Sequence, residues 1–161
     1  MHDPGLWYKG RYLVLTQLQG QIERITYVNE ENGFTIAKVR VQGRRQLATV
    51  VGNLASPTPG EVLHMKGEWV KHSRYGEQFK VSHFESKAPS SIYGIQKYLG
   101  SSLIQGIGPV MAKRIVEKFG KNTLEIIDNK PGKLSQVSGI GTKRIGMIKV
   151  AWEEQRDIRE V

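Results

Sequence analysis

The stretch from residue 18 to residue 85 alternates between apolar and polar side chains, which is the pattern of half-buried β-strands. The alternation is clearest where Val39 and Val41 are interleaved with Lys38 and Arg40. The runs are separated by short stretches rich in glycine, asparagine, serine and proline. We predict five strands, at residues 20–28, 34–41, 47–54, 62–71 and 78–84.

The turns between these strands predict how the strands connect. Residues 29–33 (Asn-Glu-Glu-Asn-Gly) form an acidic hairpin tip, and residues 73–76 end in Gly76, which takes positive φ without steric cost. Two prolines in residues 56–60 stop the ladder after the third strand, because proline lacks the N–H. Five short antiparallel strands in residues 17–87 favour a closed Greek-key barrel of the OB type. An SH3-like barrel is the alternative, since no helix is predicted between the third and fourth strands.

The spacing of apolar residues becomes helical after residues 87–91 (Lys-Ala-Pro-Ser-Ser), and we place a domain boundary there. Ile92, Ile95, Tyr98 and Leu99 share one helical face, and residues 100–102 (Gly-Ser-Ser) are expected to end that helix and cap the next. The predicted fold class is therefore α+β, with an all-α domain in residues 88–161. Residues 1–16 are an arm, an added segment or an extra edge strand, and we assign them no function.

A short motif occurs twice in the helical region, with its glycines 33 residues apart. Gly106 and Gly108 flank an isoleucine in the first copy, and Gly139 and Gly141 flank one in the second. Each copy has an apolar residue two positions before its first glycine, and each precedes a basic amphipathic stretch. These residues resemble the helix-hairpin-helix motif, whose tandem form is found across DNA-repair and recombination proteins.

The repeated motif suits phosphate binding. Paired glycines let the backbone approach a ligand closely, and the free N–H groups of a helix N-terminus attract an anion. Lys143 and Arg144 follow Gly141 within the first helical turn, whereas Lys113 and Arg114 come one turn later after Gly108. The alternative is that one or both hairpins only pack helices or bind a neighbouring domain.

The amino-acid composition limits the kinds of molecule that the chain is expected to bind. The 161 residues contain 24 Lys and Arg against 15 Asp and Glu, a net charge of +9, and nucleic acid is the commonest polyanion such a surplus serves. The alternative interpretation of this charge is a soluble basic protein that does not bind nucleic acid. No cysteine is present, which excludes disulfides, thiolate metal sites and cysteine nucleophiles and suits the cytoplasm. The longest apolar run near the start has three residues, so neither a spanning helix nor a signal peptide is expected.

Catalytic and metal sites are not expected in this chain. The four histidines lack metal-ligand spacing, and the Gly-x-Ser-x-Gly motif is missing. Aromatic residues on the predicted strands are interleaved with lysine and arginine, as in barrels that stack single-stranded bases. We expect Phe34 and Trp69 to be core residues, and we leave open whether Tyr75, at a hairpin tip, is exposed. The candidate DNA-binding residues are Gly106, Gly108, Lys113, Arg114, Gly139, Gly141, Lys143, Arg144, Tyr75 and Arg74.

Three strings together resemble a known family. They are residues 32–35 (Asn-Gly-Phe-Thr), 74–79 (Arg-Tyr-Gly-Glu-Gln-Phe) and 106–109 (Gly-Ile-Gly-Pro). Over about residues 17–161 the chain resembles the N-terminal region of RecD-like ATP-dependent DNA helicases. The resemblance implies a 5′-to-3′ motor driven by ATP and Mg²⁺, but the phosphate-loop motif is absent here, so we expect no cofactor in this chain and an N-terminal piece of a longer protein.

The leading hypothesis is a DNA-binding accessory region that contacts backbone phosphates without sequence preference. Its expected partners are DNA, the motor domains of the same parent chain, and single-strand-binding or other repair proteins, with no membrane. The first alternative is a protein docking module that does not touch DNA. The second alternative, a nuclease, is disfavoured by the missing carboxylate and histidine clusters.

Overall fold

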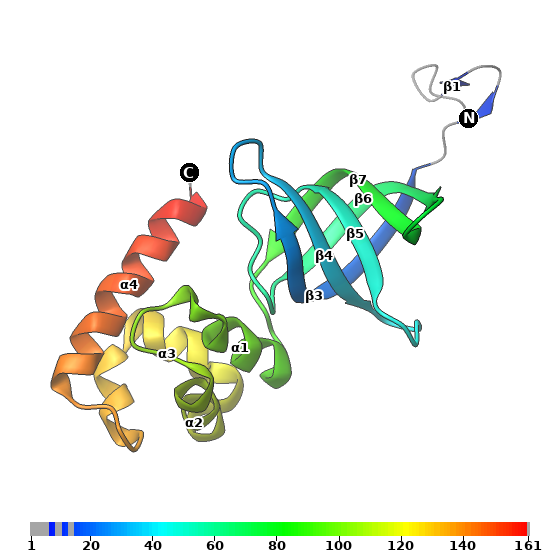
Figure 1. Ribbon diagram of the computed structural model, residues 1–161. Coiled ribbons are helices and arrows are strands. Elements are labelled where there is room, and N and C mark those ends of the chain that lie inside the picture. Colours follow the sequence, from blue (N-terminus) through cyan, green and yellow to red (C-terminus); the bar gives the residue numbers. More distant parts are fainter. Residues whose placement is uncertain (1–6, 9–10, 13–14, 161) are drawn as a thin grey trace. The chain divides into compact units, whose positions relative to one another are not determined.

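The computed structural model describes residues 7–8, 11–12 and 15–160 and divides the chain into two compact units (Figure 1). The first unit comprises Met1–Pro57 and Val62–Lys87, and the second comprises Thr58–Glu61 and Ala88–Val161. Each unit has a hydrophobic core of its own. The short segment Thr58–Glu61, which the strand pattern assigns to the barrel region, is grouped with the helices.

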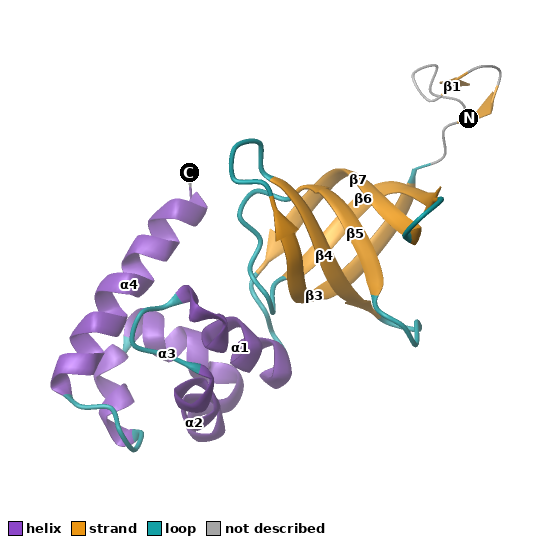
Figure 2. Ribbon diagram, viewed as in Figure 1, coloured by secondary structure: helices purple, strands orange, loops and turns teal. Residues whose placement is uncertain are grey.

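The first unit is a closed five-stranded barrel, as the alternation predicted (Figure 2). Its neighbouring strands follow the order β3-β4-β5-β7-β6, and β6 pairs with β3 to complete the ring. Inward positions of the strands form the barrel core, with Ile22, Val39, Val50, Leu63 and Phe79 fully buried. The strands are β3 (Thr16–Val28), β4 (Phe34–Val41), β5 (Ala48–Asn53), β6 (Val62–His72) and β7 (Gly76–Lys87).

The expectation that every strand pair is antiparallel is wrong. β5 and β7 run parallel, with Val50 beside Phe79 and Val51 beside Lys80, and the other four pairs are antiparallel. The reason is geometric. Strand directions cannot alternate around a closed ring with an odd number of strands, so a five-stranded barrel must contain at least one parallel pair.

Two aromatic residues expected in the barrel core differ in position. Trp69 is half-buried and packs edge-on against Phe79, with ring centroids 5.1 Å apart. Phe34 is 39% exposed, so its core assignment is wrong. The outward positions of β4 begin at Phe34, and its ring lies 6.4 Å from that of the exposed Tyr27 on β3.

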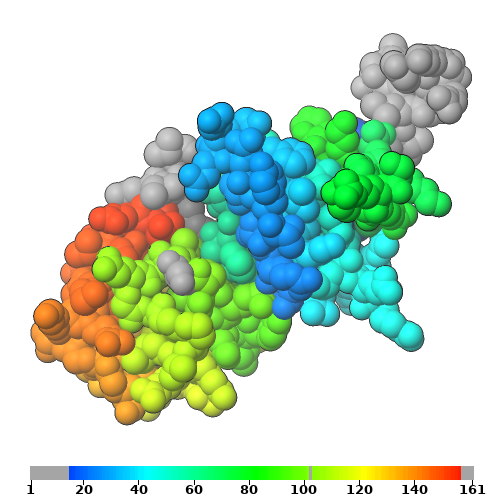
Figure 3. All heavy atoms as spheres, in the orientation of Figure 1, coloured from blue at the N-terminus to red at the C-terminus, as the bar shows by residue number. Residues whose placement is uncertain are grey.

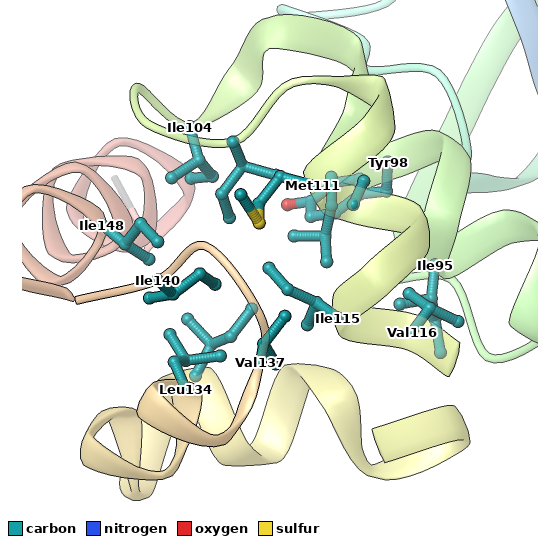
Figure 4. Close-up of a cluster of buried hydrophobic side chains, with 14 residues drawn as sticks. Ile95, Tyr98, Ile104, Met111, Ile115, Val116, Leu134, Val137, Ile140 and Ile148 are labelled. Atoms are coloured by element: carbon teal, nitrogen blue, oxygen red, sulfur yellow. The ribbon is translucent and has the colours of Figure 1, made fainter. Parts of the chain in front are cut away.

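The second unit is built from helices around one apolar cluster (Figure 4). Ile95, Tyr98, Ile115, Leu134 and Ile148 are almost completely buried in this cluster. The α-helices are α1 (Ile92–Tyr98), α2 (Pro109–Phe119), α3 (Thr123–Asn129) and α4 (Thr142–Glu160). The shorter turns are a π-helical turn, η2 (Leu99–Leu103), and two 3₁₀ turns, η3 (Gly120–Asn122) and η4 (Pro131–Gln136).

The α-helix α1 ends at Tyr98, just before residues 100–102, as predicted, but the prediction that these residues cap the next helix is wrong, because Gly108 caps α2. The chain continues from α1 into the π-helical turn η2, and Ser101 Oγ donates to the carbonyl of Tyr98 at 2.8 Å instead of capping the next helix. Leu99 is fully buried in the apolar cluster, which holds the π-helical turn against the helical unit. Ser91 provides the helix cap nearby, since its Oγ accepts a hydrogen bond from Gly94 N at 3.0 Å.

The N-terminal arm is described only in part. β1 (Trp7–Tyr8) and β2 (Arg11–Tyr12) pair as a short antiparallel ladder, and residues 1–6, 9–10 and 13–14 lie outside the described residues. No helix in the described part of the chain is both long enough and apolar enough to cross a membrane. Among the same residues, His, Asp and Glu side chains do not gather in groups that would hold a metal ion.

Candidate nucleic-acid interface

The two glycine motifs fold into turns with the same backbone geometry. Ile107 N donates to the carbonyl of Ile104 at 3.1 Å, and Ile140 N donates to the carbonyl of Val137 at 3.1 Å. The isoleucine between the glycines is buried in both copies, at 3% and 5% exposure. Figure 4 shows Ile140 and Val137 within the apolar cluster of the helical unit. The apolar residues of the motif therefore anchor each turn in the core.

The two glycines of each turn have different roles. Gly106 has φ +98° and Gly139 has φ +92°, a region that disfavours side chains. Gly108 has an extended backbone with φ −103°, and Gly141 is not among the positive-φ residues. A Cβ added at Gly108 or Gly141 would meet no atom within 4 Å. The first glycine is thus required by the fold, whereas the second leaves open space beside the start of a helix.

Each second glycine leads directly into a helix. Gly108 caps α2 without a side-chain hydrogen bond and accepts the first helical bond from Ala112 N at 2.8 Å. Gly141 accepts the corresponding bond from Ile145 N at 3.0 Å at the start of α4. The first N–H groups of a helix have no partner within the helix, so both ends present partial positive charge. In Figure 3 the residues around 140, coloured orange, lie at the surface.

The cationic residues near the turns are solvent-exposed but are distributed unequally. Lys143 and Arg144 lie in the first turn of α4. At the equivalent positions of α2 are Val110, which is 67% exposed, and Met111, which is buried. Lys113 of α2 lies one helical turn further from Gly108. The second hairpin therefore carries positive charge next to its open glycine, and the first carries an exposed apolar tip.

Arginine side chains connect the two turns, which the sequence did not predict. Arg144 of the second hairpin donates from Nη1 to the carbonyl of Gly106 in the first turn at 3.4 Å. Arg114 of the first hairpin donates from Nη1 to the carbonyl of Ser138 in the second turn at 3.3 Å. The sequence predicts that Arg144 acts beside Lys143 at its own turn. Its hydrogen-bond acceptor belongs to the other hairpin, a contact that depends on tertiary packing and leaves no local signal in the sequence.

The two remaining candidates lie in the barrel unit, at the tip of the β6–β7 hairpin. Tyr75 is 66% exposed, with the guanidinium carbon of Arg74 5.7 Å from its ring centroid. His72 Nδ1 accepts hydrogen bonds from the backbone N–H groups of Arg74 and Tyr75 at 3.1 and 3.2 Å, which fixes the turn. The tip thus presents an exposed aromatic ring beside a cation. The other eight candidates all belong to the helical unit.

The strand order and the paired glycine turns together define an OB-type barrel followed by a tandem helix-hairpin-helix unit. Comparison with known families agrees. Residues 15–89 match the family described as the OB-fold domain of ATP-dependent DNA helicase YrrC. Residues 101–154 match the SAM-like helix-hairpin-helix tandem. The SH3-like alternative for the barrel is thereby set aside.

Among curated proteins, the chain is similar to the ATP-dependent RecD2 DNA helicase of Deinococcus radiodurans. The two are 25% identical over 145 residues, which cover 86% of this chain and 20% of the relative. The chain therefore spans about a fifth of the length of the curated relative it matches. The resemblance to the N-terminal region of RecD-like helicases is confirmed.

Alanine at the two glycines of the second turn should separate their roles. Gly139→Ala places a Cβ at φ +92°, 3.1 Å from Arg114 Nη1 and 3.2 Å from Met111 Cε, and should lower the free energy of unfolding by about 1 to 3 kcal/mol. Gly141→Ala enters open space and should change stability by less than about 0.5 kcal/mol. Denaturant unfolding of both variants gives the comparison. Equal stability losses would contradict this division of roles.

Proposed function

We propose that this chain is a DNA-binding accessory region of a RecD-like, ATP-dependent 5′-to-3′ DNA helicase. It holds DNA by the backbone phosphates at its two hairpin turns and does not read base sequence. The observation that carries the proposal is the open space at Gly108 and Gly141, each at the start of a helix. Glycine is not needed there for the backbone conformation, so a ligand that approaches the backbone closely explains both residues.

Charge supports phosphate as that ligand. Lys113 and Lys143 follow the two turns, are exposed, and form no ion pair within the described residues. Their ammonium groups are thus available to a polyanion. Backbone N–H groups and lysines recognise phosphates whatever the base, so binding of this kind is sequence-independent. The net charge of +9 adds long-range attraction to DNA.

The two hairpins contribute unequally in this proposal. The second hairpin has Lys143 in the first helical turn, close to the amides beside Gly141, and it is the stronger phosphate site. The first hairpin has the exposed Val110 at the equivalent position, so its grip depends on backbone N–H groups and on Lys113 one turn away. At the barrel tip, Tyr75 and Arg74 offer a stacking surface for an unpaired base.

The parent protein would supply the rest of the activity. In a RecD-like helicase the motor domains bind ATP and Mg²⁺ and are the natural intramolecular partner of this region. Single-strand-binding or other repair proteins are further partners, and the cytoplasm is the proposed location. No hydrolysis of ATP is assigned to the residues of this chain, because the phosphate-loop motif is absent from its sequence.

Titration of the purified chain with duplexes of unrelated sequence tests the proposal. We expect similar dissociation constants for all of them, of roughly 10⁻⁴ to 10⁻⁶ M at physiological salt. The logarithm of the affinity should fall linearly with the logarithm of the salt concentration, by about 0.9 for each phosphate contact. Fluorescence anisotropy over a salt series measures both quantities. Undetectable binding at about 50 mM salt would overturn the proposal.

A protein docking role is the second candidate, and the exposed Val110 favours it for the first hairpin. Val110 is 67% exposed at a helix N-terminus, and contact with an apolar protein surface would remove its side chain from water. Val110→Lys distinguishes the two roles. If the first hairpin binds phosphate, the added charge should strengthen DNA binding and steepen the salt dependence, whereas an unchanged affinity would favour docking.

A further inference from the structure

The contacts of Arg114 and Arg144 are reciprocal. Each arginine lies on the helix that follows one glycine turn, and each donates to a backbone carbonyl in the other turn, at 3.3 and 3.4 Å. The neighbouring side chains are reciprocal as well. Met111 and Arg114 of α2 lie against Gly139, and Ile148, Met147 and Arg144 of α4 lie against Gly106. Each turn is therefore covered by the helix of the other hairpin.

In both copies of the repeat, one methionine and one arginine lie against the glycine of the other turn. The two residue types have swapped positions between the copies. With the glycines aligned 33 residues apart, Met111 of the first copy corresponds to Arg144 of the second, and Arg114 corresponds to Met147. Each copy thus has one methionine and one arginine, in opposite order, three and six residues after its second glycine. The pair fills the same role in both turns although neither residue type keeps its position.

Each hydrogen bond is made to one particular peptide group of the other turn. The carbonyl of Ser138 belongs to the peptide whose N–H is that of Gly139, so the bond from Arg114 directs this oxygen toward α2. The carbonyl of Gly106 belongs to the peptide whose N–H, on Ile107, donates within the first turn. A carbonyl oxygen beside a phosphate would repel it, because both carry negative charge. The guanidinium groups hold these oxygens and offset their charge.

We propose that Arg114 and Arg144 are positioning residues that join the two turns into one phosphate-binding unit, each orienting the turn of the other hairpin. This inference rests on the proposed function. Arg114 then acts through the phosphate site of Lys143 and the second turn, and Arg144 acts through the first turn. Neither arginine needs a phosphate of its own. The coupling runs across hairpins, so damage to one helix weakens binding at the other turn.

A double-mutant cycle with Arg114→Met and Lys143→Met tests the coupling. Methionine is the residue that the other repeat has at the position of Arg114, so it should be tolerated on the helix. At about 50 mM salt each single change should cost about 15-fold in duplex affinity, and the double variant no more than about 30-fold. A loss of about 200-fold in the double variant, the product of the singles, would overturn the proposal.

Lys113→Met is the matched control, because Lys113 is the exposed neighbour of Arg114 and makes no hydrogen bond to the second turn within the described part of the chain. The double variant Lys113→Met/Lys143→Met should therefore lose duplex affinity by the product of the two single losses. A second measurement needs no DNA. The N–H residual dipolar coupling of Gly139 should change in Arg114→Met and stay constant in Lys113→Met.

The DNA titrations and the dipolar-coupling measurement together separate failure of this inference from failure of the proposed function. If the wild-type chain does not bind DNA, the proposed function fails, and the dipolar coupling alone decides whether Arg114 orients the second turn. If DNA binds but the N–H residual dipolar coupling of Gly139 is unchanged in Arg114→Met, the positioning role is overturned while the proposed function stands. Arg144→Met with Lys113→Met provides the same cycle for the first turn.

Discussion

The double variant Lys113→Gln/Lys143→Gln is expected to bind duplex DNA roughly 200-fold more weakly than the wild-type chain at about 50 mM salt. Each phosphate contact releases about 0.9 counterion, which is worth about 15-fold in affinity at that concentration. The slope of the salt dependence should fall by about 1.8 for the two contacts. Both lysines are exposed, so the fold should be unaffected, and anisotropy titrations over a salt series measure the effect.

Lys118→Gln/Lys121→Gln is the control for net charge. It removes the same two charges at the opposite end of α2, because Lys118 lies in the last turn of that helix and Lys121 in η3. Eleven helical residues at about 1.5 Å each place this end roughly 16 Å from the first glycine turn. Equal losses in the two double variants would show that general positive charge binds DNA and that the hairpin turns do not.

Phe79→Ala should lower the free energy of unfolding of the barrel by about 3 to 5 kcal/mol. Phe79 is 0% exposed, lies on β7 at the parallel pairing with β5, and supports the half-buried Trp69. Phe34→Ala makes the same chemical change at a 39% exposed position and should cost much less. Urea unfolding followed by circular dichroism compares the two. Similar losses would mean that the barrel core is not where the structure places it.

The five strands followed from the sequence because their causes are local, although β3 begins at Thr16, within the predicted arm, and β7 spans Gly76–Lys87 and so is longer than predicted at both ends. Alternation of apolar and polar residues is set by the two-residue period of a strand, and Gly33 and Gly76, with φ +79° and +77°, mark the turns. The pairing of β5 with β7 did not follow. It joins strands that are not consecutive in the chain, and no local pattern specifies which strand closes the ring.

The hairpins were predictable for a different reason. A repeat of 33 residues is visible in the sequence, and burial of Ile107 and Ile140 requires the same turn in both copies. The contacts of Arg114 and Arg144 were missed because they run between the copies. The cap predicted at residues 100–102 for the next helix also failed, because Ser101 Oγ donates back to the carbonyl of Tyr98 and α2 begins only after Gly108.

The parallel pairing of β5 with β7 has a consequence for how the barrel is held shut. Its register partners are Val50 with Phe79 and Val51 with Lys80, so the ladder at this junction is short. Closure there depends on the packing of Val50 and Phe79, which are both fully buried. If the junction opened, β5 and β7 would each become an edge strand with unpaired backbone groups, ready to pair with another chain. We therefore expect the side chains at this junction to protect the protein from aggregation as well as from unfolding.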